Sequence, residues 1–258
     1  MFLKKFFSQS EPPYHPRPLP EYKGELTAAN IAGIFSSCDD FECRILRTCA
    51  GSGLAATLYY IDGVTSGTDI SSLIVAPLTD IFRLGTVKTV RDCIAKIQCG
   101  AVTSCSMHCC TTLDKAVSDL THGYAVLIFD SGGIALSFEA KTSAQRSISE
   151  PQSEKSVKGA KDAFVESIRI NTSLVRRKLF TPALKVIQTT AGRKSHTTVA
   201  ILYLDGVADP AYYEELRQRN REYYSVCEAL LLEKGISPVR AVSPALIPGA
   251  KNPEGSYP

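Results

Sequence analysis

The sequence predicts a mixed α/β fold in which two subdomains share one plan. The main evidence is a phrase that occurs twice, Tyr-Ile-Asp-Gly-Val at 60–64 and Tyr-Leu-Asp-Gly-Val at 203–207. Each copy closes an apolar run, and a second apolar run followed by Ala-Gly lies upstream of each. Such a unit is typical of two adjacent strands with a tight exit turn. Strands and helices alternate along the first half, which favours helices layered on mixed sheets.

The first subdomain is predicted over residues 26–140. It begins with a helix that Thr27 caps, and apolar spacing predicts a later helix that Pro77 ends or kinks. In chain order we expect a helix at 28–36, strands at 42–48 and 54–62, helices at 68–83 and from Val87 to Gly100, a strand near 101–107, a helix at 111–121, and a hairpin of strands 124–130 and 134–140.

The second subdomain is predicted over residues 163–235, after a linker at 141–162 that has almost no apolar side chains. It starts with a helix at 161–178, in which Phe164 and Ile168 belong to a buried stripe. We expect strands at 183–189 and 197–204, and then a helix that Asp209 and Pro210 begin and Gly235 ends.

Both ends of the chain are rich in proline, which cannot join a helix interior or a central strand. Residues 1–25 are therefore predicted to be an extended arm, and residues 236–258 an extended tail.

The composition excludes some classes of protein. The net charge is only +3 and 21% of residues are charged, so no long basic face is available for a nucleic acid. The longest apolar stretch, 124–129, is far shorter than the ~20 residues of a membrane-spanning helix.

Nine cysteines and four histidines raise the question of a metal or thiol site. The tightest cluster, 105–110, holds Cys105, His108, Cys109 and Cys110 but lacks the second separated ligand pair that zinc sites usually show. We favour free thiols over a structural metal. A catalytic Cys–His pair ranks lower still, because the sequence arranges no third group to orient it.

No motif of a familiar enzyme class is present: there is no phosphate loop, no G-x-G-x-x-G, no G-x-S-x-G and no H-E-x-x-H. We predict no catalytic, metal-binding or cofactor-binding residues and no enzymatic activity. Asp62-Gly63 and Asp205-Gly206 are interpreted as turn formers rather than ligands. For the basic run 176–178 we favour a solvated helix end over a contact with acidic lipids.

A family resemblance covers about residues 35–230. The residues that carry it are Arg146-Ser-Ile-Ser-Glu150-Pro151, Glu154, Gly159, Phe164-Val-Glu166, Asn171 and Leu174-Val-Arg176-Arg177-Lys178. With these residues the chain resembles the A subunit of GerA-type spore germinant receptors, whose pattern is R-x-[ILV]-x-E-P, an acidic residue, Gly-Pro, F-x-E, Asn and L-[ILV]-R-x-[RK]. The two Asp-Gly phrases take the place of the family's YxxG segments, and Ala160 departs from its usual Pro.

The resemblance implies a soluble N-terminal domain of two α/β subdomains on the cytosolic, spore-core side of the inner spore membrane. Membrane helices are then expected beyond residue 258. Implied partners are a transporter-like membrane subunit, a lipid-anchored subunit and further copies of the A subunit, in an oligomeric nutrient-gated channel. The domain would transmit or organise the germination signal.

The resemblance also suggests a coupling region in which the linker returns against the helix that follows it. Charges there form either an ion-pair network between the subdomains or a solvated surface. The candidate coupling residues are Arg146, Glu150, Pro151, Glu166, Asn171 and Arg176. An alternative function is a small-solute-binding sensory domain with a cleft between the subdomains.

Overall fold

The structure is a computed structural model that describes a large part of the chain. The described residues are 21–47, 54–85, 87, 89–100, 102–129, 133–142, 164–192, 196–208 and 218. Several predictions fall outside these residues: most of the N-terminal arm and of the linker, the helix from Asp209 to Gly235, and the C-terminal tail.

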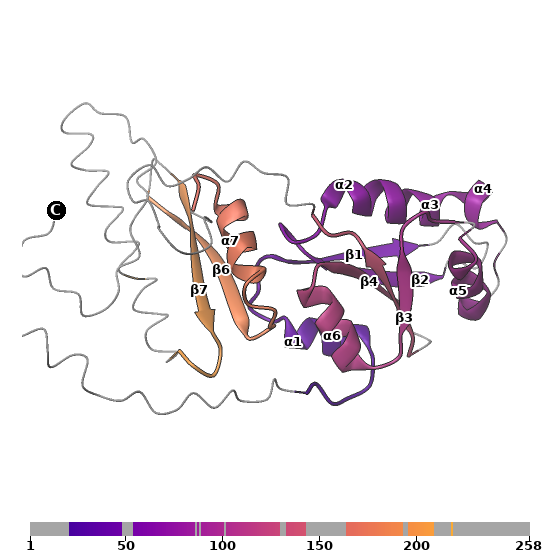
Figure 1. The fold of residues 1–258 in the computed structure, drawn as a ribbon, viewed down its shortest axis with the longest axis horizontal. Coiled ribbons are helices and arrows are strands. Elements are labelled where there is room, and N and C mark those ends of the chain that lie inside the picture. Colours follow the sequence, from indigo (N-terminus) through magenta and orange to yellow (C-terminus); the bar gives the residue numbers. More distant parts are fainter. Residues whose placement is uncertain are drawn as a thin grey trace, which may run out of the picture.

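A five-stranded sheet forms the larger part of the fold, in the order β1-β2-β4-β5-β3 (Figure 1). Every neighbouring pair in it is antiparallel. The predicted α/β class is thus confirmed, although the sheet is antiparallel where a mixed sheet was expected. Its strands are β1 (Phe41–Arg47), β2 (Ala55–Ile61), β3 (Met107–Cys110), β4 (Tyr124–Phe129) and β5 (Ala135–Glu139).

Helices cover both faces of this sheet, as Figure 1 shows. Because side chains alternate along a strand, Tyr60 and Leu58 face one core while Tyr59 and Ile61 face the other. The first core is closed by the helical segment 67–84 and by α5 (Val90–Gln98). The second is closed by α1 (Ala28–Ile34) and α6 (Leu113–Thr121).

The helix that was predicted to end or kink at Pro77 is irregular before that residue and ends at Thr79. The segment runs as α2 (Gly67–Asp69), a π-helical stretch η2 (Ile70–Val75) and α3 (Ala76–Thr79), and after Asp80 as α4 (Ile81–Leu84). Pro77 has no backbone N–H, so the regular helical hydrogen bonds cannot pass through it, and the wider π turn lies immediately upstream. Asp80 has an extended backbone, with φ −84° and ψ 112°, and separates the last two helices.

The strand predicted at 101–107 is misplaced, since β3 begins at Met107. Its pairing with β5 joins Met107 to Phe138 and Cys110 to Ala135. The stretch His-Cys-Cys at 108–110 lies between the predicted strand and the predicted helix at 111–121, and it belongs to the edge strand of the sheet.

A second antiparallel hairpin consists of β6 (Leu184–Ala191) and β7 (Thr197–Leu204), and α7 (Ile168–Arg176) packs beside it. The helix begins later than the predicted 161. Its start is fixed by Asn171, whose side-chain oxygen accepts from Val165 N at 2.8 Å while its Nδ2 donates to Val165 O at 2.7 Å. These two hydrogen bonds hold the preceding chain in a turn.

The expected burial of Phe164 is therefore wrong. Phe164 lies outside the helix and is 71% exposed, and Ile168 is only half-buried. The helix instead buries a mostly polar set of residues, Thr172, Ser173, Leu174 and Arg176.

The sequence duplication corresponds to a real repeat of local structure. Phe41 pairs with Ile61 and Leu184 with Leu204, so the same number of residues separates the partners in each hairpin. Asp62 N donates to Asp40 O and Asp205 N donates to Ala183 O, both at 2.8 Å. The glycines that follow, Gly63 and Gly206, both have left-handed backbones, with φ 81° and 76°. The division into two subdomains at 141–162 stays a prediction.

Candidate coupling site at helix α7

Helix α7 is attached to the first hairpin by a buried ion pair. Arg176 Nε and Nη2 donate to Asp40 Oδ2 and Oδ1, each at 2.8 Å. The two side chains are only 2% and 4% exposed. Burial disfavours the charged guanidinium, but the hydrogen bonds and charge of Asp40 outweigh it, so the pKa of Arg176 is raised. Arg176 stays charged, and the geometry is the two-point fork that makes arginine–carboxylate pairs specific.

A second fork lies two helical turns earlier, on the same side of α7. Arg169 Nε donates to Asp62 Oδ2 at 2.7 Å and Nη2 to Oδ1 at 2.6 Å. This pair is open to solvent, with the side chains 60% and 39% exposed. Because Asp62 N also donates to Asp40 O, the two carboxylates belong to one hydrogen-bonded strand end.

Gly63 allows the helix to come this close. A Cβ at that position would lie 3.2 Å from both Arg169 O and Ser173 Cβ. Because this space is tight and the φ of Gly63 is 81°, glycine suits this position, where the end of β2 packs against α7.

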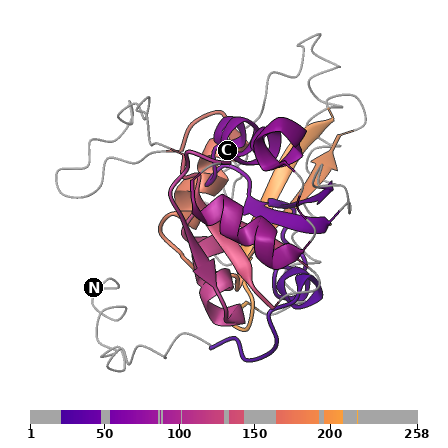
Figure 2. The same cartoon turned by 90° about the vertical axis from the view of Figure 1, so that its right-hand side faces the viewer.

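The second hairpin is also bonded to the segment 34–40, which precedes β1. Lys185 Nζ donates to Ile34 O at 3.1 Å and Ser36 O at 2.9 Å, at the end of α1. Asp39 N donates to Val186 O at 2.8 Å, and Asp39 Oδ2 accepts from Gln188 N at 2.6 Å. Both α7 and β6 are therefore hydrogen-bonded to the same short segment, residues 34–40. Figure 2 shows these elements from the end of the molecule.

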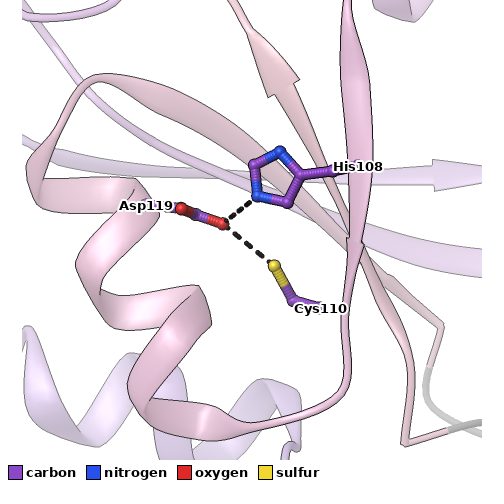
Figure 3. A group of neighbouring side chains, drawn as sticks. All are labelled: His108, Cys110 and Asp119. Carbon is purple, nitrogen blue, oxygen red and sulfur yellow. Dashed lines mark hydrogen bonds and ion pairs between the residues drawn. The ribbon is translucent and has the colours of Figure 1, made fainter.

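A separate polar cluster lies between β3 and α6 (Figure 3). Oδ2 of the buried Asp119 lies 2.7 Å from His108 Nε2, and it accepts from Cys110 Sγ at 2.9 Å and from Ser137 Oγ at 2.7 Å. Lys115 Nζ lies 2.8 Å from the other oxygen, Oδ1. Burial favours the neutral acid, but hydrogen bonds from these four partners lower the pKa of Asp119.

The cluster contains the third group that sequence reasoning did not find beside His108 and Cys110, and its environment favours the protonated thiol of Cys110. Burial and the hydrogen bond to Asp119 raise the pKa of the Cys110 thiol to about 12. Cysteine attacks as a thiolate, which this environment suppresses. His108 and Cys110 both bond to Asp119 rather than to each other, so the imidazole is not hydrogen-bonded to the thiol.

The family follows from a profile match. The profile of the Bacillus/Clostridium GerA spore germination proteins matches residues 29–235, most of the chain. The chain belongs to the GerA family.

Curated relatives match this chain over part of their own length. The membrane protein YfkQ of Bacillus subtilis (strain 168) is 29% identical over 190 residues, which are 74% of this chain and 36% of YfkQ. Spore germination protein KA of the same organism is 28% identical over 161 residues, 62% of this chain and 29% of that protein. The chain therefore spans about a third of the length of these relatives.

A solved structure shows the same fold. The N-terminal domain of the A subunit of the Bacillus megaterium spore germinant receptor GerK3 matches with a TM-score of 0.60 and 24% sequence identity. The match covers 85% of this chain and 78% of that one. Among the described residues, no helix has the length and apolar character needed to cross a membrane.

The GerA motif residues have different positions in the structure. Arg146, Glu150 and Pro151 lie outside the described residues, and Glu166 is exposed just before α7. Asn171 fixes the start of α7, and Arg176 enters the buried pair with Asp40. The interpretation of the run 176–178 as a solvated helix end is thus wrong for Arg176.

Sequence reasoning missed four residues of the coupling site: Asp40, Asp62, Arg169 and Lys185. Asp62 was interpreted only as a turn former, although its backbone makes the turn while its side chain binds Arg169. A usable signal was present, because Arg169 and Arg176 are seven residues apart and so lie on one helix face. The alternative of a small-solute cleft stays a prediction.

Proposed function

We propose that this chain is the N-terminal domain of a GerA-family receptor A subunit, and that it transmits the nutrient signal that triggers germination. The observation that supports this role is the double attachment of α7. Two arginine–aspartate forks join a helix of the second half to the strand ends of the first half. A displacement of either half then moves the other, which is the physical requirement for passing a conformational signal.

The two forks have different strengths. The Arg176–Asp40 pair is buried and doubly hydrogen-bonded, so separating it would leave a charge without a partner in the protein interior, at a cost of several kcal/mol. The Arg169–Asp62 pair is exposed, and exposed pairs contribute at most about 1 kcal/mol. The inner pair therefore acts as the fixed attachment, and the outer pair as the contact that opens and closes.

In the receptor, this domain lies on the core side of the inner spore membrane. It works beside a transporter-like membrane subunit and a lipid-anchored subunit, and it assembles with other copies of the A subunit into a nutrient-gated channel. Family membership and the GerK3 domain fold support this proposal.

The test reverses the charge of the outer pair in the full-length receptor. Arg169→Glu should slow nutrient-triggered germination at normal receptor level, because it opposes the Asp62 carboxylate without removing buried packing. The swapped pair Arg169→Asp with Asp62→Arg should restore much of the response. Arg91→Glu, an equal change of charge at an exposed position on α5, is the matched control and should germinate normally.

Germination is followed after nutrient addition, and receptor level is measured in the same spores. Normal germination with Arg169→Glu at normal receptor level would contradict the proposal. So would a defect that the charge swap does not repair and that Arg91→Glu shares, since the cause would then be net charge rather than coupling.

A further inference from the structure

Beyond this signalling role, we propose that His108, Cys110 and Asp119 form a binding site for one thiophilic divalent transition-metal ion, with Zn²⁺ as the best match. One ligand atom from each of the three residues lies within 4.8 Å of the others. Imidazole nitrogen, thiolate sulfur and carboxylate oxygen are the three ligand types that zinc takes in proteins.

The local structure places the three ligands on one side of β3. His108 and Cys110 are two residues apart on this strand, so both side chains point to the same face of the sheet, toward α6. Asp119 reaches them from the last turns of α6. Ser137 on β5 pairs directly with His108 on β3, and its hydroxyl donates to Oδ2 of Asp119.

The charges also suit a dication. A Cys110 thiolate and the Asp119 carboxylate supply two negative charges, Lys115 beside Asp119 adds one positive charge, and an imidazole ligand from His108 adds none. Lys115 holds Oδ1 of Asp119 and so leaves Oδ2 toward the other two ligands, as outer partners of metal-binding carboxylates do. When the metal binds, the Cys110 proton passes to solvent.

Metal binding requires the three ligand atoms to change their spacing. The donors now lie 2.7–2.9 Å from Asp119 Oδ2, as hydrogen-bonded atoms do. Around a tetrahedral zinc the ligand atoms are roughly 3.4 Å apart, given bonds of about 2.0–2.3 Å. Asp119 Oδ2 must therefore move away from the other two atoms, and His108 Nε2 and Cys110 Sγ, which lie within 4.8 Å of each other, must settle at a similar spacing. The His108 side chain is 38% exposed, so it marks the side from which an ion enters.

The first experiment titrates the full 258-residue chain with Co²⁺, which reports thiolate ligation through an ultraviolet charge-transfer band and four-coordination through its visible bands. We expect one ion per chain, displaced by equimolar Zn²⁺. Cys110→Ser should abolish the charge-transfer band, and His108→Gln should weaken binding at least tenfold. Cys109→Ser, which removes the exposed neighbouring thiol, should leave the spectrum and affinity unchanged.

The second measurement needs no variant, so it stands even if Cys110→Ser fails to fold. X-ray absorption of the Zn²⁺-loaded chain should show one sulfur at about 2.3 Å and nitrogen or oxygen ligands at about 2.0–2.2 Å. The proposal is overturned if no Co²⁺ band forms, if Cys109→Ser removes the band, or if the absorption data require no sulfur or more than one.

Discussion

Arg176 and Asp40 lie 136 residues apart in the sequence and form a doubly hydrogen-bonded ion pair inside the protein. The pair joins the last turn of α7 to the residue just before β1. Because the two residues come from opposite halves of the chain, this contact holds the two hairpins in fixed relation.

Removing one partner of this pair should be costly. Arg176→Ala leaves Asp40 as a buried carboxylate without its counter-charge, and we expect the free energy of unfolding to fall by about 3–5 kcal/mol. Urea unfolding of the purified chain measures the loss. The double variant Arg176→Met with Asp40→Leu should recover most of it, since apolar replacements of buried pairs are often neutral. A single variant as stable as the parent would contradict the burial.

Phe164 should tolerate truncation. Its side chain is 71% exposed, so Phe164→Ala should change the free energy of unfolding by less than about 0.5 kcal/mol. Phe129→Ala is the control, because Phe129 is fully buried in the sheet core and its loss should cost about 3–5 kcal/mol. Equal effects of the two variants in thermal or urea unfolding would place Phe164 in a core.

The two repeated glycines provide a matched pair of variants. Gly63→Ala and Gly206→Ala both force an alanine into a left-handed backbone, which costs roughly 1–2 kcal/mol. At Gly63 the new Cβ also meets Arg169 and Ser173 at 3.2 Å, whereas nothing lies within 4 Å at Gly206. Crowding of this kind adds about 1–3 kcal/mol. Urea unfolding should therefore show Gly63→Ala as clearly the less stable variant, and the reverse order would contradict the close approach of α7.

Thiol reactivity should separate the cysteines. With its pKa raised to about 12, Cys110 remains a protonated thiol at pH 8, and it is also buried. Cys43, Cys99 and Cys109 are exposed. Iodoacetamide at pH 8, followed by peptide mass spectrometry, should label these three well before Cys110. Labelling of Cys110 as fast as Cys109 would rule out the hydrogen-bonded cluster.

The sequence was most informative where local chemistry decides the structure. Thr27 accepts from Asn30 N and caps α1, Pro77 disrupts its helix, and the two Asp-Gly phrases form equivalent strand exits. Each of these depends on residues within a few positions of each other, so composition and spacing were enough to predict them.

The candidate site was harder to predict because its partners are distant in the chain. The spacing of Arg169 and Arg176 places both on one helix face, but it does not show that Arg176 is buried, since its partner Asp40 is 136 residues away in the sequence. The sequence did not distinguish Asp119 from other polar residues of α6, because only the folded position of β3 places His108 and Cys110 beside it. The predicted position of β3 was also wrong by several residues, so the sequence did not show that His108 and Cys110 share one strand.

Lys185 has a consequence for the order in which the chain acquires its structure. Its ammonium group donates hydrogen bonds to the carbonyls of Ile34 and Ser36, which are synthesised about 150 residues earlier. Asp40 likewise has no Arg176 to pair with until α7 has been synthesised. Before α7 and β6 have been synthesised, these carbonyls and the Asp40 carboxylate can bond only to water or to other groups, and such long-range contacts form late. The packing around Asp40 and the end of α1 is therefore completed only after α7 and β6 have been made.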